Sequence, residues 1–210
     1  APFVFSFQQV GTNCGLIGKN AAVEVDGSAY WMSENGFFRY TGKLESLACL
    51  VEDYVYDDLN TVPKQHIYAG LNNLFGEVTW FYPGSGAASN NRSVTYNYMD
   101  STPERPVWTT GSLARSSWSD SHIFGKPHGT EYDSSATSDT TVGNTDGVTI
   151  YYEHETGTNQ IKAGTASAIA ANIQSGDFDI SLGQGGADLR GDGEYIMKIR
   201  RVLPDFLSQT

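Results

Sequence analysis

Short runs in which apolar and polar residues alternate make up most of this sequence, and they are rich in aromatic and β-branched side chains. Each run ends in Gly, Asn, Asp, Ser or Pro, as half-buried strands do where they meet their turns. The pattern therefore predicts a mainly β fold. The predicted strands are 22–25, 28–32, 37–40, 66–71, 77–82, 93–98, 107–110, 114–119, 148–153, 168–174 and 195–203.

Turn residues stand where antiparallel hairpins need them. Asp-Gly at 26–27 separates the first two predicted strands, Glu-Asn-Gly at 34–36 separates the next two, and a Gly- and Asn-containing turn follows at 72–76. Gly, Asn and Asp accept the positive φ angles that tight hairpins require. Hairpins between consecutive strands are therefore expected at these three places.

One segment departs from the alternation. Between residues 50 and 59 the apolar side chains recur at helical spacing with acids on the other side, so one short amphipathic helix is predicted near 50–60. Its apolar positions are Leu50, Val51, Tyr54, Val55 and Leu59. Asp57 and Asp58 lie near the helix end, where the helix dipole disfavours negative charge, so a basic partner is expected to offset them.

A weak internal repeat links three of the predicted strands. A Gly followed by a strand ending in Trp or Tyr occurs at 27–31, 76–80 and 147–151, with spacings of 49 and 71 residues. The first spacing matches a propeller blade of about 40–50 residues. The second needs an insertion, and the nearly uniformly polar segment 132–146 is predicted to be that inserted loop.

Length and charge narrow the class of protein. The 210 residues correspond to one domain or slightly more, and 13 basic against 24 acidic residues give a formal charge of −11. This balance argues against a basic nucleic-acid-binding domain. No apolar run approaches the length of a membrane span. Both ends resemble strands, so 1–210 is interpreted as one segment of a longer chain.

The motifs that suggest a ligand are each incomplete. The Gly-Lys pair within 15–20 lacks the flanking residues of a phosphate-binding loop. Acids near 144–147 and 188–194 do not complete a calcium loop, and they are interpreted as turn residues. The adhesion-like triplet 190–192 and the glycosylation-like triplet 91–93 are interpreted as chance.

Two cysteines, Cys14 and Cys49, are too few for a disulfide scaffold and lack the spacing of a zinc site. Free thiols in a reducing compartment are the favoured interpretation, and a disulfide between them is the alternative.

No constellation of residues indicates catalysis. None of the four histidines, His66, His122, His128 and His154, belongs to a known catalytic signature. The adjacent acids 52–53 point in different directions on a helix. The run Glu-His-Glu at 153–155 is either a cluster of bases or an exposed turn, and the turn is favoured. The sequence therefore predicts no enzyme and no catalytic, cofactor-binding or metal-binding residues.

A set of sequence blocks recurs in order over nearly the whole chain and resembles the tail hub proteins of short-tailed bacteriophages, also called tail stabilisation or nozzle proteins. The blocks are 11–15, 20–32, 35–38, 40–42, 49–55, 76–82, 94–98, 107–108, 114–118, 152–157, 175–180 and 199–205. The sequence departs from the pattern at Ala48, where similar sequences tend to have proline, and in the long polar insertion.

The resemblance implies a structural virion protein. Such a subunit contains antiparallel blades of a β-propeller, here a partial one, and forms a homohexameric ring around the DNA exit channel below the portal and adaptor. Tail fibre or needle proteins are further implied partners, with assembly in the host cytoplasm. DNA would pass without specific binding, and an acidic wall suits that passage because carboxylates repel phosphates.

Two other functions stay open. A carbohydrate-binding or glycan-degrading propeller of a phage tail would use exposed Trp and Tyr with nearby acids, and a receptor-binding tail module is a third possibility. Residues 127–160 hold six acids and no Lys or Arg, whereas Lys198, Arg200 and Arg201 lie close together. Such faces suit a repeated contact between subunits, and a solvated surface explains them equally.

Overall fold

The computed structural model describes residues 8–121, 123–133, 147–162 and 165–169. Contacts divide the chain into two compact units, Ala1–Ser167 and Ala168–Thr210. Since nearly all of the second unit lies outside the described residues, the fold given below is that of the first. The predicted strands 168–174 and 195–203 fall outside the described residues, except for Ala168 and Ile169.

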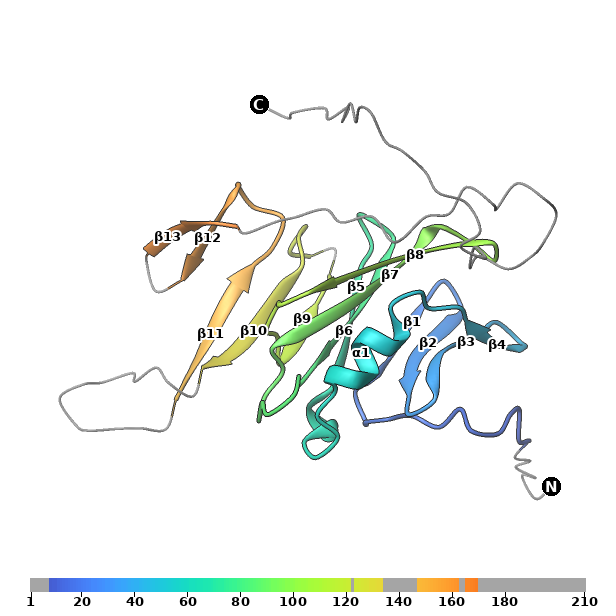
Figure 1. The fold of residues 1–210 in the computed structure, drawn as a ribbon. Coiled ribbons are helices and arrows are strands. Elements are labelled where there is room, and N and C mark those ends of the chain that lie inside the picture. Colours follow the sequence, from blue (N-terminus) through green and yellow to red (C-terminus); the bar gives the residue numbers. More distant parts are fainter. Residues whose placement is uncertain (1–7, 122, 134–146, 163–164, 170–210) are drawn as a thin grey trace, which may run out of the picture. The chain divides into compact units, whose positions relative to one another are not determined.

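The described part of the chain is mainly β, as predicted (Figure 1). Its helices are α1 (Glu52–Asp58) and a 3-10 turn, η1 (Lys64–His66). Its strands are β1 (Ala22–Val25), β2 (Ser28–Ser33), β3 (Gly36–Tyr40), β4 (Leu44–Leu47), β5 (Tyr68–Asn72), β6 (Glu77–Tyr82), β7 (Arg92–Thr102), β8 (Arg105–Gly111), β9 (Ser117–Ser119), β10 (His128–Asp133), β11 (Val148–Glu153), β12 (Asn159–Lys162) and β13 (Thr165–Ala168).

Consecutive strands pair with each other in three antiparallel sheets. Sheet 1 has the order β1-β2-β3-β4, sheet 2 the order β5-β6-β7-β8, and sheet 3 the order β11-β10-β9. The remaining strands, β12 and β13, pair in a two-stranded sheet. The turn at 26–27 has positive φ at both Asp26 (50°) and Gly27 (75°), which confirms the tight hairpin predicted there.

The first two copies of the repeat fall on corresponding strands, and the third does not. Gly27 precedes β2 and Gly76 precedes β6, and these are the second strands of sheets 1 and 2. Gly147, in contrast, precedes the third strand of its sheet. Trp80 and Phe81 of β6 are both fully buried, whereas of the corresponding Trp31 and Met32 in β2 only Met32 is, and Trp31 is partly buried. Because successive side chains point to opposite faces, this means that both faces of β6 are covered.

An aromatic layer fills the space between sheets 1 and 2. The Phe37 ring lies 4.9 Å from that of Trp80 and 4.8 Å from that of Trp108. The Trp80 indole is fully buried and donates a hydrogen bond to the carbonyl of Ala21, just before β1, at 3.0 Å. Trp108 donates in the same way to the carbonyl of Ala48, just after β4, at 2.8 Å. Both tryptophans of sheet 2 therefore bind the backbone of sheet 1.

Trp118 of β9 connects sheet 3 to sheet 2. Its ring lies against Gly70 of β5 and 5.4 Å from the ring of Phe81, and its indole N–H donates to the carbonyl of Leu71 at 2.7 Å. A Cβ on Gly70 would lie 2.6 Å from Trp118 Cγ, so only glycine allows this close approach.

The first strands of the three sheets lie beside one another. β1 contacts β5, and β5 contacts β9. Just before β1, Asn20 forms a parallel bridge to Tyr68, and the amide of Ala69 donates to the Asn20 carbonyl at 2.8 Å. Sheet 2 is thus covered on both faces, by sheet 1 and by sheet 3.

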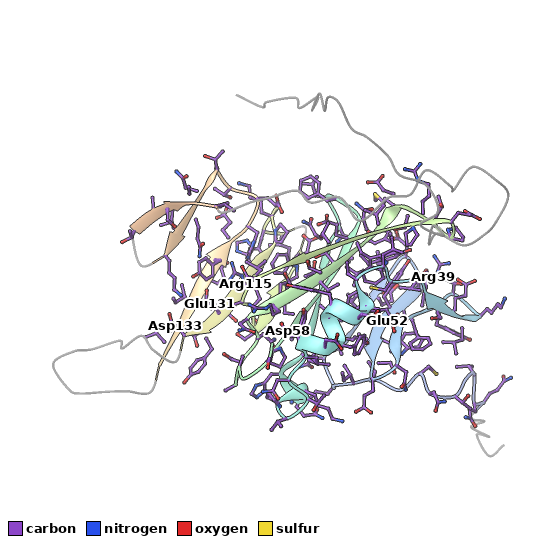
Figure 2. The ribbon with its side chains drawn as sticks, viewed as in Figure 1. Arg39, Glu52, Asp58, Arg115, Glu131 and Asp133 are labelled. Carbon is purple, nitrogen blue, oxygen red and sulfur yellow. The ribbon has the colours of Figure 1, made fainter. Side chains whose placement is uncertain are left out.

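The helix forms where it was predicted, but the predicted buried face is partly wrong. Val55 is buried, whereas Leu50 and Tyr54 are 66% and 57% exposed. Tyr56 packs inward instead and donates its hydroxyl proton to the Ser33 carbonyl at 2.6 Å. Asp58, labelled at the end of α1 in Figure 2, has the expected basic partner. Its Oδ2 lies 3.0 Å from Arg92 Nε.

Several boundaries also differ from the prediction. The segment 64–66 forms η1, so β5 begins at Tyr68 rather than at 66. Of the loop predicted over 132–146, Tyr132 and Asp133 belong to β10, and 134–146 lies outside the described residues.

Cys14 and Cys49 are both free, in agreement with the favoured interpretation, and burial raises the pKa of Cys49 to about 12.

Substituting Gly70→Ala is predicted to destabilise the protein by about 1–3 kcal/mol, because the new methyl group displaces Trp118 from β5. Urea unfolding measures the effect. The control is Gly15→Ala, where a Cβ meets no atom within 4 Å, and we expect a change within about 0.5 kcal/mol. Equal stability of the two variants would contradict the packing described.

Candidate functional site

The most concentrated chemistry in the described residues surrounds Arg115, which precedes β9. The side chain is 5% exposed, its guanidinium carbon lies 4.0 Å from the centre of the Tyr152 ring, and its Nη1 lies 3.6 Å from Glu131 Oε2. Gly129 allows Arg115 to cross β10, since a Cβ there would lie 2.8 Å from the arginine Cδ. Burial lowers the pKa of Arg115, while Glu131 raises it.

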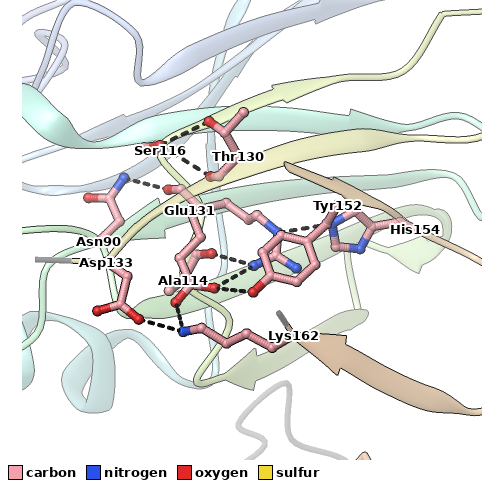
Figure 3. Close-up of polar contacts among 10 residues, drawn as sticks. Asn90, Ala114, Ser116, Thr130, Glu131, Asp133, Tyr152, His154 and Lys162 are labelled. Carbon is pink, nitrogen blue, oxygen red and sulfur yellow. Dashed lines mark hydrogen bonds and ion pairs between the residues drawn. The ribbon is translucent and has the colours of Figure 1, made fainter. Parts of the chain in front are cut away.

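Glu131 is the acceptor at the centre of this site (Figure 3). Its carboxylate accepts hydrogen bonds from the Tyr152 hydroxyl at 2.9 Å and from Lys162 Nζ at 2.8 Å. The same Nζ lies 2.9 Å from Asp133 Oδ2. Hydrogen bonds to these two carboxylates raise the pKa of Lys162. Two cations therefore face two carboxylates, and the formal charges cancel.

His154 completes the site from the other side of Arg115. The guanidinium Nε donates to His154 Nε2 at 2.9 Å, and the imidazole lies 4.4 Å from the Trp118 ring. Burial, followed by the charges of Arg115 and His128, lowers the pKa of His154 to about 4. The ring is therefore neutral at pH 7, and its proton is on Nδ1 because Nε2 accepts.

We call these six residues the charged cluster. Its members are Arg115, Glu131, Asp133, Tyr152, His154 and Lys162. They come from just before β9, from β10 and β11, from just after β11 and from the end of β12. Asn90 binds the cluster to sheet 2, since its amide donates to the carbonyls of Arg115 at 2.9 Å and His66 at 2.7 Å.

The structure separates the three residues of the Glu-His-Glu run at 153–155. Glu153 lies 3.5 Å from Lys126, and His154 points to Arg115. Glu155, which has a positive φ of 56°, accepts a hydrogen bond from the Asn72 amide at 3.2 Å. They form no cluster of bases, and His154 is packed inward rather than exposed as the favoured interpretation expected.

The other histidines that are described have no catalytic partners either. His66 Nδ1 lies 3.0 Å from the Ala88 carbonyl oxygen, and His128 stacks on Tyr151 with ring centres 5.3 Å apart. His122 lies outside the described residues, as do 144–146 and 188–194. Within the ranges that the structure describes, no three His, Cys, Asp or Glu side chains are arranged to hold a metal ion.

The charged cluster is therefore best suited to holding strands together. Each of its charges already has an opposite charge, so it offers no free nucleophile or unpaired base. A charge buried without its partner is strongly unfavourable, so an arrangement of this kind favours one packing of the strands over others.

Sequence reasoning missed the charged cluster because its members are distant in the chain. One signal was available. The segment 127–160 holds six acids without a basic residue, so an acid in a strand there needs a cation from elsewhere. Neither Arg115 nor Lys162 is identified by that signal, since their positions depend on tertiary structure.

A comparison with known protein families finds no match for this chain, and a comparison with curated proteins also finds none. In the described ranges, no helix has the length and apolar character that crossing a membrane requires.

Substituting Glu131→Gln is predicted to destabilise the fold by about 3 kcal/mol, because Arg115 then stays buried without its counter-charge. Chemical denaturation measures the change. Adding Arg115→Met should recover part of the loss, since Lys162 keeps Asp133 as its partner. The control, Glu34→Gln in the exposed pair with Lys64, should change stability by less than about 1 kcal/mol. Equal effects at the two glutamates would refute the argument.

The depressed pKa of His154 predicts a loss of stability in mild acid. Protonation favours the unfolded chain, so the stabilisation is complete above the ordinary pKa of 6.5 and is lost as the pH falls towards about 4. We expect the free energy of unfolding to fall by about 1–2 kcal/mol over this range, a figure already reduced for the partial solvent access of His154. Substituting His154→Gln keeps an acceptor for Arg115 and should flatten this pH dependence. Urea unfolding between pH 7.5 and 4.5 tests it, and identical profiles would contradict the prediction.

Proposed function

We propose that this chain is a structural subunit of the tail hub, or nozzle, of a short-tailed bacteriophage. In this proposal it forms a homohexameric ring around the DNA exit channel, below the portal and adaptor, and carries out no catalysis. The observation that supports it best is the arrangement of sheets 1 to 3, whose first strands, β1, β5 and β9, lie beside one another.

This arrangement is the one expected for blades of a β-propeller. A blade is an up-and-down antiparallel sheet of four strands, and the innermost strands of successive blades are neighbours around the axis. Sheets 1 and 2 each have four strands in this order, and they pack face to face through aromatic side chains. The partial propeller is part of the proposal.

The charge distribution supports passage of DNA without binding. Six of the nine Lys and Arg side chains in the described ranges form ion pairs with acids of the same chain. They are Arg39, Lys64, Arg92, Arg115, Lys126 and Lys162. Since phosphate binding depends on available cations, such a surface holds DNA weakly.

The tryptophans favour this function over binding of glycans. A sugar-stacking site needs an open aromatic face, yet each of the four tryptophans donates its indole N–H to a backbone carbonyl and is buried or half-buried. Exposed rings do occur at Tyr54, Tyr132 and Tyr151, so the carbohydrate alternative would have to use tyrosines rather than tryptophans.

The proposal predicts a six-fold ring with a central channel when the purified chain is examined by native mass spectrometry and negative-stain electron microscopy. A mobility-shift assay with double-stranded DNA should show no stable complex at physiological salt, because the chain has 24 acidic against 13 basic residues. A chain that stays monomeric well above micromolar concentration, or one that cleaves a glycan, would contradict the proposal.

A further inference from the structure

A cavity of about 340 Å³ lies between sheets 1 and 2. Its walls come from the β3–β4 hairpin on one side and from the β7–β8 hairpin on the other. The residues that matter for its chemistry are Arg39, Glu45, Leu47, Tyr96, Pro103 and Pro106. Apolar and polar side chains line it in equal number, and one ion pair forms part of the wall.

The cavity borders a sheet edge that is unpaired among the described strands. β4 is the last strand of sheet 1, and no described strand pairs with its outer side. Residues 45–48, which contribute to the wall, are consecutive, and the first three belong to β4. An edge strand presents alternating N–H and C=O groups to any extended chain beside it. We call the cavity together with this edge the edge groove.

A bulge in sheet 2 forms the opposite wall. The pairing of β7 with β8 shifts between Asn97, which is opposite Val107, and Thr102, which is opposite Arg105. Asn97 Oδ1 holds the bulge by accepting from the amides of Met99 at 3.0 Å and Asp100 at 2.8 Å. Bulges of this kind often re-aim a strand beside a functional site.

The ion pair selects for an uncharged occupant. Arg39 uses Nε and Nη2 on a single oxygen of Glu45, Oε2, so the charges on this wall cancel. Among the described residues, none donates a hydrogen bond to Glu45 Oε1, which leaves one acceptor for the amide N–H of a ligand. Tyr96 is only 6% exposed, so it offers no open ring face to a sugar.

We propose that the edge groove binds an extended, uncharged segment of a partner polypeptide. The segment adds main-chain hydrogen bonds to β4 and inserts one apolar side chain between Leu47 and the two prolines of the β7–β8 hairpin. This mode of recognition is strand addition, with the sheet edge supplying affinity and the cavity supplying specificity. The inference goes beyond the proposed function and does not require a ring.

The test titrates the full chain with the peptide acetyl-Thr-Val-Thr-Leu-Thr-Val-Thr-amide and follows backbone amides by NMR. Shifts should be confined to 45–48 and 101–106, with slower hydrogen exchange in β4. Substituting Thr102→Tyr, which adds a large ring to the wall formed by the β7–β8 hairpin, should weaken binding at least about tenfold. The control, Ser119→Tyr on another exposed strand position, should bind as the wild type does.

Three results would overturn the proposal. The first is that millimolar peptide produces no shifts. The second is that a backbone N-methylated peptide, which cannot pair with β4, binds equally well. The third is that N-acetylglucosamine produces shifts at the groove and the peptide does not. If Thr102→Tyr fails to fold, as judged by circular dichroism, Pro103→Tyr on the same wall replaces it with the same expected loss.

Discussion

The packing of tryptophan rings between successive sheets, with each indole N–H bound to a backbone carbonyl, is the interaction on which the other features depend. Trp80 and Trp108 reach from sheet 2 to the backbone beside β1 and β4, and Trp118 reaches from sheet 3 to β5. A ring fills space over a range of positions, but its N–H is satisfied in only a few. These bonds therefore fix how neighbouring sheets lie, including the walls of the edge groove.

The charged cluster follows from the same geometry. Trp118 brings β9 against sheet 2, and the space beside it is filled by Arg115 and His154 rather than by apolar side chains. Because Arg115 is buried, its charge needs the Glu131 carboxylate opposite it, and Lys162 of β12 pairs with the remaining oxygen. The Arg115 pair thus adds a side-chain contact beside the backbone ladder that already joins β9 to β10, and the Lys162 pair connects β12 to β10.

The sequence predicted the elements that depend on local rules and missed those that depend on distant partners. Alternation and turn residues located β1, β6 and β11 to the residue. β4 and β10 were missed because their sequences, Leu-Glu-Ser-Leu and His-Gly-Thr-Glu-Tyr-Asp, have weak strand propensity and depend on pairing with β3 and β11. Tyr56 rather than Tyr54 packs inward from α1, and this, like the charged cluster, follows from tertiary contacts. The proposed function comes from the resemblance, which local physics cannot supply.

The central claim is that successive sheets are arranged as blades, and an experimental structure of the chain, by crystallography or by electron cryomicroscopy of its assembly, tests it most directly. The account predicts that β1, β5 and β9 run in the same direction nearest a common axis, with β4 and β8 farthest from it. A closed sandwich in which β4 pairs with β8, or first strands that lie apart, would contradict it.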